Sequence, residues 1–195
     1  AGTDRLHLLY WSRMTEHTET ILDASAVERT LRRMAGEIVE ANGGTENLII
    51  VGIQRRGVQL ADRIVALIKA SDGVTVPRGA LDITLYRDDL QTIGPRPVVG
   101  STDVPGAIDG STVVIVDDVL FTGRTIRAAL DELADFGRPA RIELAVLIDR
   151  GGRELPIQPD VVGRKVDARP GDRVDVLVDD FDGRSAVVLL SKRFE

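Results

Sequence analysis

Along most of the chain, hydrophobic residues follow one of two patterns: short unbroken apolar runs, or apolar positions three and four residues apart. Unbroken runs are typical of parallel strands buried on both faces, whereas the wider spacing is typical of helices with one buried side. The predicted strands cover residues 48–53, 80–86, 113–116, 142–148, 174–178 and 186–190. The predicted helices cover residues 25–42, 58–69 and 124–136. Because strands and helices alternate, we expect an α/β fold with a central, mainly parallel sheet flanked by helices.

The first of these helices carries the clearest end signals. Ser25 and Glu28 have the spacing of a capping box, and Gly43 with Gly44 supplies a stop. The apolar residues keep helical spacing throughout: Val27, Leu31, Met34, Ile38 and Ala41. One face of this helix is therefore expected to lie in the core.

Three segments lack such a pattern. Residues 87–111 are rich in Gly, Pro, Asp and Thr, and because loops of this length are often functional, we expect a flexible lid. Residues 151–195 contain several prolines and two strand-like runs, and are expected to form a small C-terminal hood with closing strands. Residues 1–20 are expected to be a flexible N-terminal extension, which leaves residues 21–195 as one domain.

The composition restricts the classes of protein that remain. The chain has 195 residues, 43% of them hydrophobic, without an apolar run long enough to cross a membrane, so a soluble globular domain is expected. The N-terminal segment lacks the charged start and apolar centre of a secretory signal. No cysteine is present, which excludes disulfides and thiolate chemistry and suits a cytoplasmic protein. The net charge of −6 argues against nonspecific binding of nucleic acid, although a local arginine patch could coexist with it.

The run VVIVDDVLFTGRT, residues 113–125, contains the main candidate for chemistry. Ligands of open parallel sheets bind beyond the carboxyl ends of the strands, where Asp117 and Asp118 are expected. The next residues lead into a helix, so their N–H groups and the hydroxyls of Thr122 and Thr125 can surround a phosphate. Two carboxylates would repel that phosphate, so we expect them to face sugar hydroxyls or Mg²⁺. A phosphorylated ribose satisfies both halves of the run.

This run resembles the phosphoribosyl pyrophosphate (PRPP) motif of type I phosphoribosyltransferases, with several apolar residues, two acids and a T-G-x-T loop. Further segments are similar to the PyrR family, which combines RNA regulation of pyrimidine operons with uracil phosphoribosyltransferase activity. They are VGIQRRGVQLADRI, LDITLYRDDL, GRPARIELAVLIDRGGRELPI and PDVVG. The resemblance covers roughly residues 21–194. It implies the type I phosphoribosyltransferase fold, with a small C-terminal hood.

For the sugar and the phosphates, the resemblance implies roles for the residues of the matching motifs. Asp117 and Asp118 would hold the ribose hydroxyls, and Asp118 would also stabilise positive charge on the sugar ring. The 5′-phosphate would be bound by the loop that follows: Val119, Leu120, Phe121, Thr122, Gly123, Arg124 and Thr125. Pyrophosphate would be bound by a second loop: Arg55, Arg56 and Gly57. The family usually has Thr in place of Arg55. Arg87, at the root of the lid, would approach pyrophosphate on closure and completes the catalytic set with Asp117 and Asp118.

The implied reaction is displacement of pyrophosphate from the anomeric carbon of PRPP by a ring nitrogen of uracil, which gives UMP. Mg²⁺ would be bound mainly through the pyrophosphate groups, with Asp117 and Asp118 as the candidate side-chain ligands. Positioning and electrostatics carry such a reaction, so no nucleophilic residue is required. The base would be held in the hood largely through backbone groups, with four candidates: Arg150, Val161, Val162 and Val174. Core packing explains the valines equally well, and another base, such as hypoxanthine, is the alternative substrate.

The resemblance also implies a regulator that responds to UMP and binds the leader mRNA of pyrimidine (pyr) operons in transcription attenuation, as a homodimer or higher homo-oligomer. The candidate RNA-binding residues are Arg32, Arg33, Arg150 and Arg153. They would hold RNA phosphates on a basic concave surface, while unpaired RNA loops would supply base readout. Two histidines that are typical of the family are replaced here by Gly36 and Gly152. An enzyme without an RNA role therefore stays open as the alternative.

Overall fold

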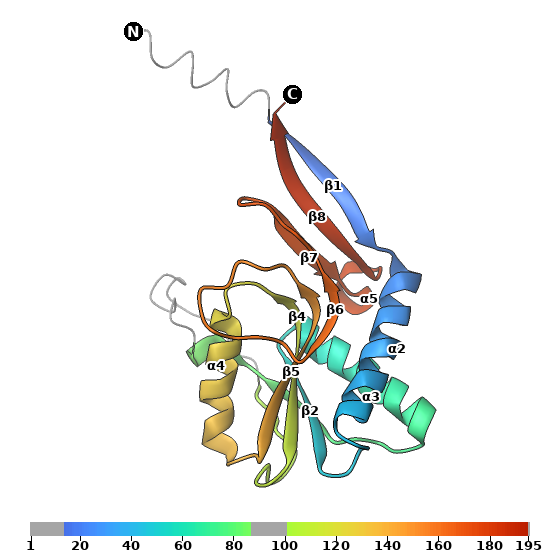
Figure 1. Cartoon of the computed structure of the whole chain (residues 1–195), viewed down its shortest axis with the longest axis vertical. Coiled ribbons are helices and arrows are strands. Elements are labelled where there is room, and N and C mark those ends of the chain that lie inside the picture. Colours follow the sequence, from blue (N-terminus) through green and yellow to red (C-terminus); the bar gives the residue numbers. More distant parts are fainter. Residues whose placement is uncertain (1–13, 87–100, 195) are drawn as a thin grey trace. The chain divides into compact units, whose positions relative to one another are not determined.

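The computed structural model describes residues 14–86 and 101–194, and Figure 1 shows the order of their elements. The chain divides into two compact units. The larger unit is Glu28–Val166, and the smaller unit combines Ala1–Val27 with Asp167–Glu195.

Two predictions fall partly outside the described residues. The predicted lid is described only from residue 101 onward, so Arg87 at its root lies outside. Residues 1–13 of the predicted N-terminal extension lie outside as well.

The larger unit is built on a five-stranded sheet in which every neighbouring pair is parallel. The strand order is β3-β2-β4-β5-β6. The strands are β2 (Leu48–Ile53), β3 (Arg78–Leu81), β4 (Thr112–Leu120), β5 (Arg141–Asp149) and β6 (Val161–Lys165). β2 is buried along its whole length, and so is β4 from Val113 to Asp117. This is the burial expected for parallel strands that are covered on both faces.

Helices cover both faces of this sheet, with α4 on one side and α2 and α3 on the other (Figure 1). The helical elements are α2 (Ala24–Ala41), α3 (Arg56–Asp72), α4 (Arg124–Leu133) and the 3₁₀ turns η1 (Ile83–Tyr86) and η2 (Ala134–Phe136). Ile126 and Leu133 of α4 belong to the main hydrophobic core. α2 packs closely on the edge strand β6, where a Cβ atom on Gly163 would lie within 3.0 Å of Thr30 and Met34. Among the described residues, no helix is both long enough and apolar enough to span a membrane.

The smaller unit contains an antiparallel sheet of three strands in the order β1-β8-β7. Its elements are β1 (Met14–Leu22), β7 (Arg173–Leu177), the short helix α5 (Asp179–Asp182) and β8 (Ala186–Phe194). The alternating residues Val174, Val176 and Val178 are buried, as expected for a sheet with one covered face.

The predicted α/β architecture is confirmed, but two predictions near the N-terminus were wrong. Residues 14–20 belong to β1 and pair with β8, whereas a flexible extension was predicted. Residues 16–20 are all polar, and their partner strand lies at the other end of the chain, so the local pattern does not reveal the pairing. The helix cap is Asp23, whose Oδ1 accepts a hydrogen bond from the Ala26 N–H at 2.8 Å, in place of the capping box at Ser25 and Glu28.

Two other boundaries also differ from the prediction. The strand expected at residues 80–86 ends at Leu81, because the Asp82 carboxylate accepts hydrogen bonds from both the N–H and the hydroxyl of Thr84. Such a bond from a side chain to the backbone turns the chain, here into η1. The hood predicted at residues 151–195 is smaller than expected, because β6 joins the main sheet beside β5 and only Asp167–Glu195 falls in the other unit.

Candidate active site

The two aspartates of the VVIVDDVLFTGRT run lie inside β4, although the strand was predicted to end before them. β4 pairs with β2 only as far as Val116 opposite Gly52, while its pairing with β5 continues with Asp117 opposite Val146. Since the ladder to β2 stops there, the edge of β4 at the aspartates is open on that side. This is the carboxyl edge of the sheet, where ligands of such folds bind.

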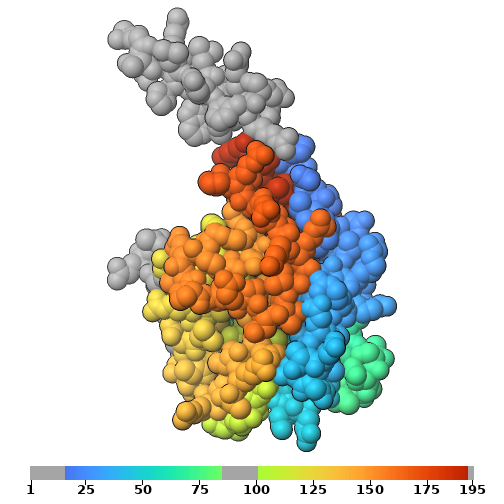
Figure 2. Space-filling model, viewed as in Figure 1, coloured from blue at the N-terminus to red at the C-terminus, as the bar shows by residue number. Residues whose placement is uncertain are grey.

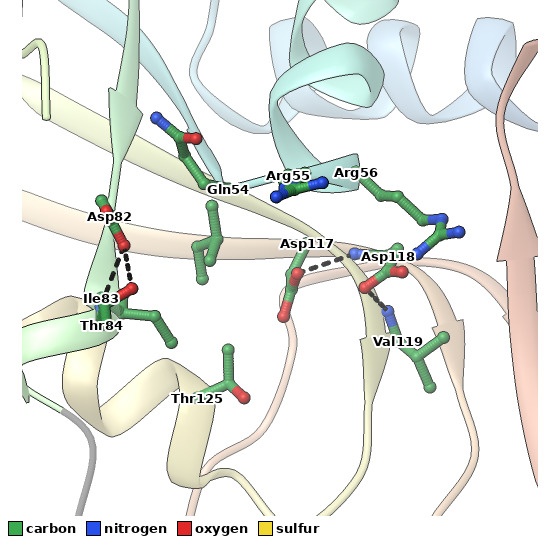
Figure 3. A pocket seen from close by; sticks show the side chains of 11 residues that line it. Gln54, Arg55, Arg56, Asp82, Ile83, Thr84, Asp117, Asp118, Val119 and Thr125 are labelled. Atoms are coloured by element: carbon green, nitrogen blue, oxygen red, sulfur yellow. Dashed lines mark hydrogen bonds between the residues drawn. The ribbon is translucent and has the colours of Figure 1, made fainter. Parts of the chain in front are cut away.

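A pocket of about 330 Å³ opens at this edge. Its lining residues are Ile53, Gln54, Arg55, Arg56, Asp82, Ile83, Thr84, Asp117, Asp118, Val119 and Thr125. Figure 3 shows Asp82 and Thr84 on one side of the space, Asp117 and Asp118 on the other, and Thr125 at the start of α4. The structure therefore brings together six of the predicted site residues from two separate segments of the sequence, the loop at residues 55–57 and the run at residues 113–125.

The aspartate pair is strongly perturbed by burial. Asp117 is 6% exposed, and its Oδ1 accepts a hydrogen bond from the Asp118 N–H at 3.0 Å. Burial raises the pKa of Asp117 well above its ordinary value, and the neighbouring charge of Asp118 raises it further. Burial also raises the pKa of Asp118, although the Val119 N–H and the nearby positive charge of Arg56 act in the opposite direction. Such a pair is stabilised by ligand hydroxyls or by a cation.

The loop before α3 reaches this site because two glycines allow close contact between the backbone of β4, the start of α3 and β2. A Cβ atom on Gly57 would lie 2.5 Å from the carbonyl oxygen of Val116, and one on Gly52 would lie 2.5 Å from the carbonyl oxygen of Gly57. Only glycine allows the start of α3 to come this near to β4. The Gln54–Arg55 peptide bond in this loop is cis.

The predicted phosphate loop begins in β4 and ends in the first turn of α4. Gly123 has a φ of +92°, a conformation that favours glycine, and it stands directly before the helix. The Thr122 Oγ1 accepts a hydrogen bond from the Arg124 N–H at 3.3 Å. Thr125 lines the pocket that also holds Asp117, so the positive end of the α4 dipole contributes to the same site.

Sequence reasoning did not single out five residues of the pocket lining: Ile53, Gln54, Asp82, Ile83 and Thr84. Gln54 donates a hydrogen bond from Nε2 to the carbonyl oxygen of Ser101 at 2.8 Å, which ties the described end of the predicted lid to the pocket rim. The Asp-x-Thr spacing of Asp82 and Thr84 is a local turn signal, and it could have indicated that the chain bends here.

The four base-binding candidates do not all lie in one unit. Val161 is buried in β6 opposite Ala145, and Val162 is half-buried beside the core. Val174 is buried in β7 of the smaller unit. The Arg150 guanidinium lies over the ring of Phe121, 3.9 Å from its centre. Their role toward the base stays a prediction.

Three of the predicted RNA-binding arginines differ in the exposed fraction of their side chains. Arg32 is 73% exposed and lies 3.6 Å from Glu28. Arg33 is paired with Glu37 at 2.6 Å and also donates to two carbonyl oxygens of β6. The surface of α2, blue in Figure 2, accordingly borders the orange surface around β6. Arg153 is 16% exposed and bonded within its own chain, so Arg32 alone of these three has a largely exposed side chain.

The two glycines that replace family histidines have different surroundings. Gly152 has a φ of +77°, and a Cβ atom there would lie 2.5 Å from a ring carbon of Phe121. A histidine at this position would collide with that ring. Gly36 has no atom within 4 Å of its Cβ position, so nothing in the structure requires glycine there.

The aspartate pair also offers oxygen atoms of the kind that Mg²⁺ prefers. Within the described parts of the chain, no three His, Cys, Asp or Glu side chains are grouped so that they could hold a metal ion. The pair therefore fits Mg²⁺ where a substrate supplies further oxygen ligands, as the phosphates of PRPP can.

Known proteins resemble this chain in sequence, and solved structures resemble it in fold. The phosphoribosyl transferase domain family matches residues 17–181. The bifunctional protein PyrR of Pelotomaculum thermopropionicum is 54% identical over 91% of this chain and 98% of its own. The proteins of the same name from Chloroflexus aurantiacus and Thermus thermophilus are 58% and 54% identical, each over 87% of this chain and 93% of theirs.

Solved structures with the same fold are more distant in sequence. The hypoxanthine phosphoribosyltransferase of Trypanosoma cruzi aligns with a TM-score of 0.67 and 19% identity, over 91% of this chain and 97% of that one. That of Staphylococcus aureus aligns with a TM-score of 0.63 and 18% identity, over 87% and 90%. These likenesses confirm the type I phosphoribosyltransferase fold and show the fold alone. From the matched domain, and from identities above half over nearly the whole length of its relatives, the chain belongs to the phosphoribosyl transferase domain family and, within it, to the PyrR proteins.

Proposed function

We propose that this chain transfers the phosphoribosyl group of PRPP to uracil, forming UMP and pyrophosphate. The observation that carries the proposal is the pocket in which the Asp117–Asp118 pair, the Arg55–Arg56 loop and the start of α4 meet. These three parts match the three polar parts of PRPP, which are the ribose hydroxyls, the pyrophosphate and the 5′-phosphate.

Each part of the pocket has one task in the proposed reaction. Asp117 and Asp118 accept hydrogen bonds from the ribose hydroxyls, and Asp118 stabilises the positive charge that develops on the ring. Arg55 and Arg56 bind pyrophosphate as its bond to the anomeric carbon breaks and the electron pair leaves with its oxygen. A ring nitrogen of uracil forms the new bond to that carbon and releases its proton. When bound, Mg²⁺ neutralises the oxygens of the leaving pyrophosphate.

Within the larger unit, the base is proposed to bind beside Arg150, Val161 and Val162, largely through backbone groups. The valines offer no polar side chain, so the choice of base depends on where the backbone N–H and C=O groups stand. Initial rates with PRPP, Mg²⁺ and a panel of uracil, cytosine, hypoxanthine and guanine test this assignment. Uracil is expected to react at least about tenfold faster than the others. Faster reaction of hypoxanthine would overturn the choice of uracil but leave the PRPP site in place.

As a second function, we propose that UMP-bound homodimers, or higher oligomers, bind the leader mRNA of pyrimidine operons in the cytoplasm. This is supported by the name "bifunctional" of relatives at 54–58% identity and by the exposed Arg32 on α2. Gel shifts of leader RNA with and without UMP, together with light scattering of the free protein, test the proposal. A shift that appears only with UMP is expected, and no shift at low salt would rule the function out.

A further inference from the structure

Arg153 is held in place by three different segments of the larger unit. Its Nε donates to the carbonyl oxygen of Ile157 at 3.0 Å, and one terminal nitrogen donates to the carbonyl oxygen of Phe121 at 2.9 Å. The other terminal nitrogen forms an ion pair with Asp149 at 2.7 Å. A planar guanidinium used on all three of its edges fixes the relative positions of its partners, and lysine cannot reproduce this.

The residues around Arg153, 150–157, connect β5 to β6 and bind the phosphate loop at several further points. The Arg150 N–H donates to the carbonyl oxygen of Leu120 at 3.1 Å. The N–H groups of Glu154 and Leu155 donate to the carbonyl oxygen of Thr122, at 3.0 and 3.1 Å. With Arg153 on the carbonyl of Phe121, three consecutive carbonyl groups of the loop are turned toward residues 150–157.

The direction of these carbonyls decides where the loop's N–H groups point. In a trans peptide, the C=O of one residue and the N–H of the next point in opposite directions. Fixing three consecutive carbonyls on residues 150–157 therefore turns the N–H groups of Phe121, Thr122 and Gly123 to the opposite side. Consecutive N–H groups with a common direction form an anion-binding concavity, whereas a carbonyl turned into it would repel a phosphate.

The side chains of the same two segments are packed together as well. The ring of Phe121 packs against the Arg150 guanidinium and also against Gly152, which has no room for a side chain. A Cβ atom on Gly123 would lie 3.3 Å from Ile157 and 3.4 Å from Leu155. The Arg124 Nε donates to Glu154 at 2.9 Å. The phosphate loop therefore depends on residues 150–157 for its conformation.

We propose that Arg153 is a positioning residue for the 5′-phosphate of PRPP, acting through the carbonyl group of Phe121. The inference rests on the proposed PRPP site and extends it to a residue that does not line the pocket. It also differs from the RNA role predicted for Arg153, because a guanidinium bonded on three edges within its chain has little left to offer an RNA phosphate.

The Arg153→Lys variant separates the two roles, since lysine keeps the charge that attracts RNA but loses the planar set of donors. Calorimetric titrations with Mg²⁺ give the affinity for PRPP and, separately, for pyrophosphate, which lacks the 5′-phosphate. We expect the Kd for PRPP to rise at least about tenfold while the Kd for pyrophosphate stays the same. Arg138→Ala, which removes an exposed arginine outside the site, is the matched control and should change neither constant.

An unchanged Kd for PRPP in folded Arg153→Lys would overturn the inference, whether or not RNA binding was lost. Equal weakening of PRPP and pyrophosphate would also overturn it, because that is the result of a general loosening of the pocket. If Arg153→Lys does not fold, Asp149→Asn removes the ion pair and should show the same selective loss to a smaller degree. Wild-type protein that binds PRPP but converts no base would refute the proposed enzyme and leave this test intact.

Discussion

The pocket and the predicted RNA-binding arginines use their charges in different ways. In the pocket, burial raises the pKa of Asp117 and Asp118, so their carboxylates gain from any ligand that offers hydroxyls or a cation. Arg33 and Arg153 are instead paired with carboxylates of their own chain and bonded to its carbonyl groups. The pocket is prepared for a ligand, whereas these arginines mainly hold the fold together. A charged residue in a motif therefore indicates a binding site only if its charge is not already paired within the chain.

The largest effect is expected from removing a charge in the pocket. Asp118→Asn takes away the carboxylate that is proposed to face the sugar ring, so we expect kcat/KM for UMP formation to fall at least about 100-fold. The fold should survive, because the change also removes the repulsion between Asp118 and the buried Asp117. The exposed Asp131→Asn is the control and should keep full activity. Normal activity of Asp118→Asn would remove the basis of the site assignment.

The close approach of α3 to β4 can be tested with a pair of glycine variants. Gly57→Ala places a Cβ atom against the Val116 carbonyl, so we expect a loss of about 1–3 kcal/mol in the free energy of unfolding and weaker pyrophosphate binding. Gly36→Ala meets open space in a helix and should stabilise the protein by about 1 kcal/mol. Urea unfolding of both variants gives the comparison. Equal stability of the two would mean that Gly57 is not tightly packed.

The arginines of α2 should separate RNA affinity from stability. Arg32→Ala removes an exposed charge, so we expect the slope of log K against log salt for leader RNA to become shallower by about 0.7, with stability unchanged. Arg33→Ala should cost about 1 kcal/mol of stability, because two carbonyl groups of β6 lose their donor. Filter binding at several salt concentrations and urea unfolding measure the two effects. An unchanged free energy of unfolding in Arg33→Ala would contradict the stabilising contact of Arg33 with β6.

The smallest effect concerns Glu132 of α4, which is 3% exposed and accepts a hydrogen bond from the Thr102 hydroxyl. Burial raises the pKa of Glu132. The stability that this carboxyl group contributes is therefore fully present below its pKa in the unfolded chain, near 4.5, and is lost as the pH rises through its pKa in the folded protein. Glu132→Gln should therefore match the wild type in urea unfolding at pH 4 and exceed it at pH 7. A difference that is the same at both pH values would contradict a raised pKa.

Much of the fold and half of the site could be predicted because their signals are local. The apolar runs predict four of the five strands of the main sheet but not β6, which was assigned to the hood. VVIVDDVLFTGRT places the two aspartates and the predicted phosphate loop together in the chain. β1 could not be predicted, because its polar residues gain their order only from pairing with β8. Asp82 and Thr84 reach the pocket through the order of strands in the sheet, which no local pattern reveals.

The arginines show a further limit of prediction from sequence. Arg32 and Arg33 are neighbours with the same side chain, yet one is exposed and the other is bonded to β6. The direction of each side chain depends on which face of α2 meets the sheet. Arg153 looks like a surface charge in the sequence, and its contact with Phe121 depends on how the connection from β5 to β6 folds over the phosphate loop.

A crystal structure of the chain with UMP tests the central claim most directly, because UMP carries the ribose, the 5′-phosphate and the base in one molecule. We expect the phosphate to lie on the N–H groups of Phe121, Thr122 and Gly123, beside the first turn of α4, and the ribose hydroxyls to donate to Asp117 and Asp118. A phosphate bound instead at Arg55 and Arg56, or a ribose turned away from the aspartates, would contradict the assignment.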